Sequence, residues 1–116
     1  MSFEKLRVYQ AAELLDLEVK KLIASVPRGF SADINHLNRA IGSLLYNVPE
    51  AYGSEHSGRK RYHLEMARGS VDEARAVLRR LARDGALTKK AIARACGLTS
   101  AIAKMLTAWM DTLPEE

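Results

Sequence analysis

The fold is decided by residues 34–53, which read INHLNRAIGSLLYNVPEAYG. Apolar residues recur there at steps of three and four, the spacing of one face of an α-helix. A second face carries the polar residues Arg39, Ser43, Asn47 and Glu50 at the same kind of spacing. An amphipathic helix needs one apolar face to pack in a bundle. This second face, called the polar stripe below, therefore indicates a further structural or binding role.

Small and polar residues continue the pattern in the following segment, at Gly69 and Ser70, with Glu73 three residues on. One interpretation is that the stripe binds a ligand or phosphate. The other is a structural network with partners on the next helix or on a neighbouring subunit, since buried polar groups need hydrogen-bond partners. Small residues let two helix backbones approach closely, which favours the structural interpretation. We therefore expect a role in fold and assembly for Arg39, Ser43, Asn47, Glu50, Gly69, Ser70 and Glu73.

Proline and glycine divide the chain into four amphipathic segments, and no stretch alternates at period two for long enough to indicate a strand. We predict one all-α domain, residues 1–116, that forms an antiparallel up-down-up-down four-helix bundle. The expected helices cover residues 3–25, 32–52, 58–83 and 88–112.

Local signals predict where these helices begin and end. Ser31 and Thr88 are expected N-caps, and Asp84-Gly85 is a C-terminal signal. Pro49 lies in the last turns of the second expected helix. Because proline removes a backbone hydrogen bond, it is expected to bend or fray that helix end.

Composition bounds the class of protein. The chain has 116 residues, 47% hydrophobic, with a net charge of +4 and a single cysteine, Cys96. This length suits one self-sufficient core, and a lone thiol fits a reducing compartment. No apolar run approaches the length of a membrane span. We expect a soluble, cytoplasmic protein with no membrane partner.

The positive charge is concentrated in residues 57–84, where eight Lys or Arg stand against four Asp or Glu. One interpretation is a solvated face on which charges of alternating sign, from Arg61 to Arg79, pair with neighbours one turn away. The other is a surface that follows a nucleic-acid backbone and weakens steeply with salt. For that role the candidate residues are Arg59, Lys60, Arg61, Arg79, Arg80 and Arg83.

Residues 90–106 offer a competing interpretation, a DNA-binding helix-turn-helix. In that motif Thr99 or Ser100 would cap a recognition helix, and the chain would break near Gly97. The recognition helix would carry few side chains able to read bases. The alternative is one long helix with a tolerated glycine, which costs roughly 1 kcal/mol relative to alanine.

Catalytic patterns are weak throughout the chain. His36, His56 and His63 lack the spacing and companions of a zinc site, and Cys96 has no nucleophile constellation. The glycine loop at residues 53–58 lacks the lysine of a phosphate-binding loop. We expect no enzyme, no metal and no cofactor.

The polar stripe also carries a family resemblance. The residues concerned are Asn38-Arg39-Ala40, Ser43-Leu44, Asn47-Val48, Glu50, Tyr52-Gly53, Ala67-Arg68-Gly69-Ser70, Glu73 and the opening residues 3–11. They resemble a bacterial four-helix-bundle family encoded within intervening sequences of large-subunit ribosomal RNA genes. Relatives of that family include the accessory variability determinant of diversity-generating retroelements.

The resemblance implies a bundle that assembles into a ring, usually a homopentamer, without catalytic activity. For the retroelement relatives it implies binding to a reverse transcriptase and to nucleic acid. We therefore expect a non-enzymatic oligomeric scaffold that contacts RNA, DNA or a nucleic-acid enzyme through a basic face. A purely structural or protein-interaction ring is the main alternative, and the helix-turn-helix regulator is the lesser one.

Overall fold

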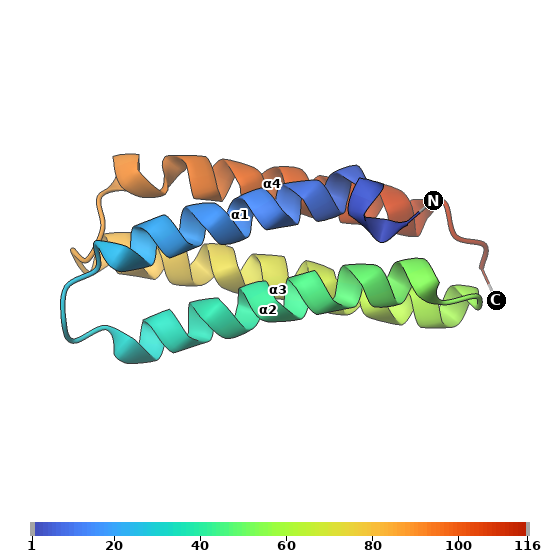
Figure 1. The fold of residues 1–116 in the computed structure, drawn as a ribbon, viewed down its shortest axis with the longest axis horizontal. Coiled ribbons are helices and arrows are strands. Elements are labelled where there is room, and N and C mark those ends of the chain that lie inside the picture. Colours follow the sequence, from blue (N-terminus) through green and yellow to red (C-terminus); the bar gives the residue numbers. More distant parts are fainter. Residues whose placement is uncertain (1, 116) are drawn as a thin grey trace.

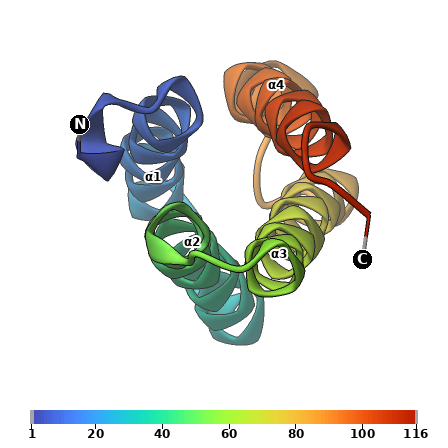
Figure 2. The ribbon, with the colours of Figure 1, turned by 90° about the vertical axis from the view of Figure 1, so that its right-hand side faces the viewer.

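The computed structural model is a bundle of four helices that run alternately up and down and lie around the bundle in chain order (Figures 1 and 2). The structure describes residues 2–115, and within them it contains no β-strand. After a 3₁₀ turn at Phe3–Lys5, the helices are α1 Arg7–Ala24, α2 Ser31–Gly53, α3 Ser57–Arg83 and α4 Lys89–Asp111. The last three helices match their predicted bounds to within one residue. The first expected helix is split because Leu6 is extended, with φ −68° and ψ 131°.

The core lies between all four helices. α2 and α3 share the most extensive contact, followed by α3 with α4, whereas α1 packs less extensively on α4 and on α2. Each helix contributes fully buried leucines, such as Leu15, Leu44, Leu64 and Leu106. Removing one such side chain from water contributes about 2 kcal/mol. The α2–α3 pair is therefore the best-packed part of the bundle.

The predicted end of α3 is confirmed in detail. Gly85 takes a positive φ of 83°, which favours glycine. Its N–H donates to the Ala82 carbonyl at 3.2 Å, and the N–H of Ala86 donates to the Leu81 carbonyl at 2.9 Å. These two bonds form the glycine-terminated C-cap that closes a helix and satisfies its last carbonyl groups.

The two predicted N-caps differ in outcome. Thr88 caps α4 as expected, and its Oγ1 accepts from the Ala91 N–H at 3.0 Å. The prediction for Ser31 is wrong, because Ser31 is the first residue inside α2 and Phe30 is its N-cap. The Ile34 N–H already donates to the Phe30 carbonyl at 3.0 Å, so the helix begins one residue early. At the other end, Pro49 does not terminate α2, which continues to Gly53.

The helix-turn-helix interpretation of residues 90–106 is wrong, because α4 is continuous through Gly97. Thr99 is 1% exposed, and its hydroxyl donates to the Cys96 carbonyl at 2.7 Å. It lies inside the helix and caps nothing. Burial of neighbouring apolar residues, including Ile102 and Leu106, offsets the low helix propensity of glycine here.

Two glycine substitutions test these helix assignments. A β-carbon added at Gly97 meets no atom within 4 Å. Gly97→Ala should therefore raise the free energy of unfolding by about 0.5–1 kcal/mol through helix propensity. Gly85→Ala, at positive φ, should lower it by about 1 kcal/mol or more. Urea unfolding followed by circular dichroism measures both, and destabilisation by Gly97→Ala would contradict a continuous α4.

Candidate functional site

Four polar side chains form a hydrogen-bonded series between α2 and α3, called the polar chain below. Asn47 is 6% exposed, and its Nδ2 donates to Ser43 O at 2.9 Å and to Ser43 Oγ at 3.1 Å. Ser70 Oγ lies 2.8 Å from Ser43 Oγ and 3.0 Å from the Met66 carbonyl oxygen. His63 Nδ1 lies 2.9 Å from Asn47 Oδ1. The polar chain therefore runs from His63 through Asn47 and Ser43 to Ser70.

The direction of these hydrogen bonds follows from the backbone. A carbonyl oxygen can only accept, so the Asn47 atom that faces Ser43 O must be the amide nitrogen. Its oxygen then faces His63, and His63 Nδ1 must carry a hydrogen in order to donate. The polar atoms that join α2 to α3 are thereby satisfied, as burial requires.

The polar chain contains three residues of the predicted set and adds His63, which the sequence analysis missed. Ser43 and Asn47 come from the stripe, and Ser70 from the segment expected to oppose it. His63 lies seven residues before Ser70, and a spacing of seven keeps two residues on one helix face. That spacing is the sequence signal by which His63 could have been found.

The ends of the stripe do not join the polar chain. Arg39 is exposed and has no ion-pair partner among residues 2–115. The carboxylate of Glu50 accepts a hydrogen bond from the Tyr46 hydroxyl, and this bond raises the pKa of Tyr46. Both side chains lie on the outer surface of α2, so their expected role in assembly stays a prediction.

Of the α3 residues expected to oppose the stripe, Glu73 contacts α2 and Gly69 does not. Glu73 Oε2 lies 2.8 Å from His36 Nε2, so it ties α3 to α2 beyond the polar chain. Gly69 is exposed, and a β-carbon added there meets no atom within 4 Å. Within one chain, Ser70 rather than Gly69 lies at the close contact between α2 and α3.

Two of the six predicted basic residues donate hydrogen bonds to carbonyl groups at helix ends. Lys60 Nζ donates to the carbonyl oxygens of Ala51 at 3.0 Å and Tyr52 at 3.3 Å, at the end of α2. Arg61 Nη2 donates to the Met110 carbonyl oxygen at 3.4 Å, at the end of α4. Cations are favourable at helix C-termini, where carbonyl groups lack partners. These two side chains are therefore structural as well as basic.

The predicted series of ion pairs along α3 does not form. Among residues 2–115, neither Glu65 nor Asp72 makes an ion pair. Arg68 instead turns to α4, where its Nη1 donates to the Thr107 hydroxyl. Neighbouring ion pairs on a helix contribute only a few tenths of a kcal/mol, so contacts between helices prevail.

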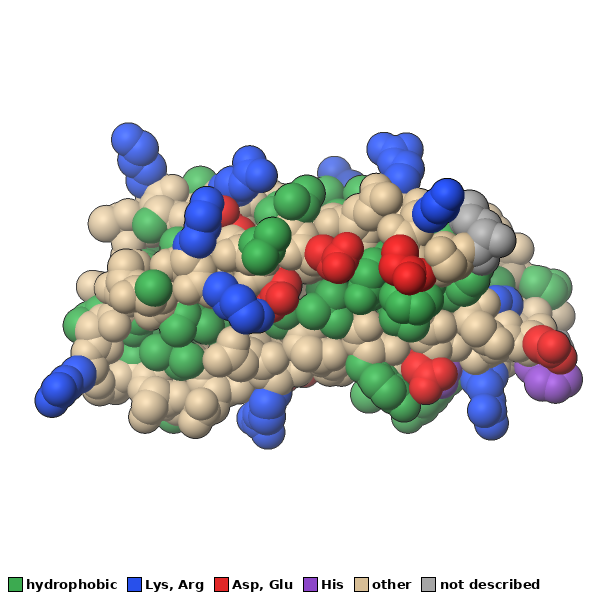
Figure 3. Space-filling model, viewed as in Figure 1, with side chains coloured by type: hydrophobic (Ala, Val, Ile, Leu, Met, Phe, Trp, Pro, Cys, Tyr) green, Lys and Arg blue, Asp and Glu red, His purple; other side chains and the backbone are tan. Residues whose placement is uncertain are grey.

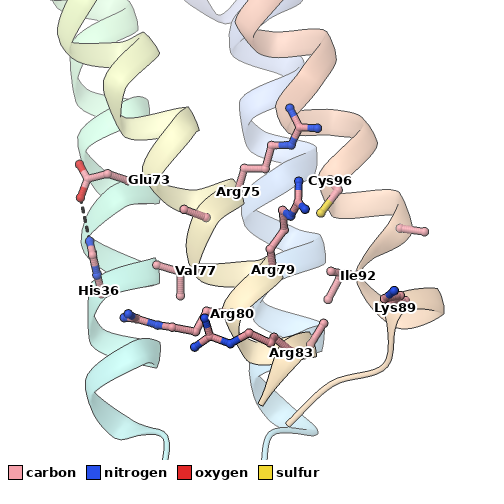
Figure 4. Close-up of a pocket in the computed structure, with 13 residues that line it drawn as sticks. His36, Glu73, Arg75, Val77, Arg79, Arg80, Arg83, Lys89, Ile92 and Cys96 are labelled. Atoms are coloured by element: carbon pink, nitrogen blue, oxygen red, sulfur yellow. Dashed lines mark hydrogen bonds and ion pairs between the residues drawn. The ribbon is translucent and has the colours of Figure 1, made fainter. Parts of the chain in front are cut away.

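Three of the four remaining predicted cations line a hollow along α3 (Figure 4). The hollow encloses about 1080 Å³, and α2, α3 and α4 all contribute to its lining. It brings together Arg79, Arg80 and Arg83, and it adds Arg75 and Lys89, which the sequence analysis did not select. Arg59, an exposed residue near the start of α3, is not part of the lining.

The charges on one side of the hollow are paired. Arg80 Nη2 lies 2.8 Å from Asp33 Oδ1 on α2. Arg83 Nε lies 2.9 Å from Asp84 Oδ1. The hydrogen bond between them raises the pKa of Arg83 and lowers the pKa of the Asp84 carboxyl. These two pairs give Arg80 and Arg83 carboxylate partners, whereas Glu73 is bonded to His36.

The charges on the α4 side are unpaired. Arg75, Arg79 and Lys89 have no ion-pair partner within the described residues 2–115. In Figure 4, Arg75 and Arg79 extend from α3 towards Cys96 on α4. Burial raises the pKa of the Cys96 thiol, and the two guanidinium groups partly oppose that rise. This side of the hollow therefore combines uncompensated positive charge with a partly buried thiol.

The fold and these contacts define a small all-α protein with a polar α2–α3 contact and a basic hollow. The chain belongs to the 23S rRNA-intervening sequence protein family, whose sequence model matches residues 4–108. This match confirms the predicted family resemblance. In comparisons with curated proteins and with solved structures, no protein matches the chain.

Membrane-spanning and metal-binding features are both missing from residues 2–115. None of the helices there has the length and apolar character needed to cross a membrane. Nor does this part of the chain contain a group of three or more His, Cys, Asp or Glu that could hold a metal ion.

A substitution in the polar chain should destabilise the bundle. Asn47→Ala removes the bonds to Ser43 and leaves the buried side of His63 without an acceptor, which should cost about 1–3 kcal/mol. Asn38→Ala, at an exposed position on the same helix, is the control. Urea unfolding measures both, and equal effects would contradict a structural role for the polar chain.

Proposed function

We propose that this protein is a non-enzymatic scaffold that assembles into a ring of five copies and binds nucleic acid through α3. The observation that carries the proposal is the unpaired positive charge of Arg75, Arg79 and Lys89 beside the paired Arg80 and Arg83. A ring multiplies this charge by the number of copies. Phosphate contacts of this kind give affinity that does not depend on base sequence and that falls steeply with salt.

Exposed apolar side chains support self-association. One patch lies on α1, where Leu14 is 47% and Leu17 is 61% exposed. A second patch follows the α2–α3 contact, where Tyr46, Tyr62 and Met66 are 62%, 59% and 45% exposed. Exposed apolar patches rimmed by polar groups are typical of protein interfaces. The face formed by α1 and α2 also shows hydrophobic side chains along much of its length (Figure 3).

The polar chain explains why the second patch is continuous across two helices. Asn47 faces His63, and Ser43 faces Ser70. This antiparallel register places Met66 of α3 level with Tyr46 of α2. Two patches on different helices suit a head-to-tail contact, in which one patch of each copy covers the other patch of the next and the series closes.

The ring is tested by its mass. Light scattering should give about five times the chain mass of 12.9 kDa. Leu17→Asp should shift the protein towards monomer, because it places a charge in an apolar contact. Asn38→Asp adds the same charge at an exposed polar position and should leave the mass unchanged. A monomeric wild-type protein would reject the ring.

Nucleic-acid binding is tested by its salt dependence. The slope of log affinity against log salt should flatten by roughly 0.7–0.9 for each phosphate that a variant no longer neutralises. Alanine at Arg75, Arg79 and Lys89 should flatten the slope measured with a labelled RNA or DNA oligonucleotide. Alanine at Arg7, Lys20 and Lys21 of α1 removes the same charge and should change it less. Equal slopes in the two triple variants would reject the basic face of α3 as the surface that binds nucleic acid.

A structural or protein-interaction ring without nucleic-acid binding is the second candidate. It is favoured by the helix-end contacts of Lys60 and Arg61 and by the carboxylate partners of Arg80 and Arg83. These contacts give four of the six predicted basic residues a role inside one chain. This function predicts the same mass by light scattering and no shift of RNA or DNA at any salt concentration.

A further inference from the structure

We propose that the α4 side of the hollow is a binding site for a phosphate group, held by Arg75, Arg79 and Lys89. The inference deepens the proposed function, on which it rests in assigning the basic side of α3 to binding. It goes further in naming the ligand group and in separating these three residues from Arg80 and Arg83. The phosphate can belong to a nucleic-acid backbone or to a small phosphorylated molecule.

Two of the donors, Arg75 and Arg79, are spaced to share one phosphate. Arg75 and Arg79 are four residues apart on α3, a spacing that places their β-carbons about 5–6 Å apart. Each guanidinium presents a planar fork that matches two oxygens of a phosphate. Lys89 is the first residue of α4, across the hollow from α3. The four oxygens of a phosphate can accept from both guanidinium groups, which the two oxygens of a carboxylate do less completely, and Lys89 adds positive charge to the same hollow.

The helix end beside Lys89 reinforces the same charge. The first backbone N–H groups of a helix have no acceptor within the helix, and its N-terminus carries partial positive charge. The Thr88 side chain satisfies the N–H of Ala91. The N-terminus of α4 therefore adds to a site that is already built from three cationic side chains.

Within residues 2–115, the surroundings leave these three cations without an ion-pair partner. Glu73 is the carboxylate of the lining, and it is bonded to His36 on the other side of α3. Ile92, Ala93 and Cys96 form the apolar floor on the α4 side. A bound phosphate would relieve the repulsion among the three cations.

Cys96 provides a reporter inside the proposed site. Its thiolate is the reactive form, and the two guanidinium groups favour it. A phosphate that neutralises or covers them should slow alkylation of Cys96 by iodoacetamide roughly threefold at low salt. The probes are pyrophosphate, a 5′-phosphorylated RNA oligonucleotide, and polyglutamate as a carboxylate control.

The variants locate the effect. Arg75→Gln combined with Arg79→Gln should abolish the slowing, with each rate compared with and without probe in the same protein. Lys5→Gln combined with Arg7→Gln removes two positive charges at the opposite end of the bundle and should retain it. Circular dichroism checks that both variants stay folded, as expected for exposed side chains.

The outcomes separate the inference from the proposed function. Slowing by both phosphate probes supports both. Slowing by pyrophosphate alone supports the phosphate site and rejects nucleic acid as its source, whereas slowing by the oligonucleotide alone assigns the phosphate to a nucleic-acid backbone. The inference is overturned if neither probe slows the wild-type reaction, if the arginine variant is slowed equally, or if polyglutamate acts as strongly as phosphate.

Discussion

The hydrogen-bonded contact between α2 and α3 is the constraint on which the other features depend. The polar atoms of Asn47, Ser43 and Ser70 lie where the two helices meet, so the helices must pair in a register that satisfies them. Each buried donor or acceptor that lacks a hydrogen bond costs about 1–3 kcal/mol, a large share of the stability of a small domain. Leucine packing alone tolerates more registers, because apolar contacts are not directional.

That register also distributes the surface charge. It brings Asp33 of α2 to Arg80 of α3, so a charge of the basic segment is compensated where α3 faces α2, and it brings His36 to Glu73. The side of α3 that faces α4 receives no such compensation within the described residues. Arg75 and Arg79 share the hollow with Ile92, Ala93 and Cys96 of α4 and with another cation, Lys89. The same pairing of α2 with α3 therefore produces both the stable core and the basic side of the hollow.

The sequence predicts the parts of the fold that depend on local chemistry. The helical periodicity, the cap at Thr88 and the stop at Gly85 are properties of short segments, and the structure confirms them. The prediction of Ser31 as N-cap failed because its neighbour Phe30 supplies the first helical carbonyl acceptor. The stripe indicated a polar network, but its exact members depend on which helix face meets which, and this is a tertiary property.

The sequence predicts the basic character of the candidate site better than it predicts which residues line it. The concentration of arginine in α3 is visible in the sequence, but the partners of long side chains are not. Lys60 and Arg61 reach carbonyl groups at helix ends, whereas Arg75, expected in a local ion-pair series, has no ion-pair partner among the described residues. The most direct test of the account is nitrogen NMR of the neutral His63 imidazole, because the polar chain requires its hydrogen on Nδ1. Long-range proton–nitrogen correlations should show that tautomer, and a hydrogen on Nε2 would contradict the α2–α3 register on which the account is built.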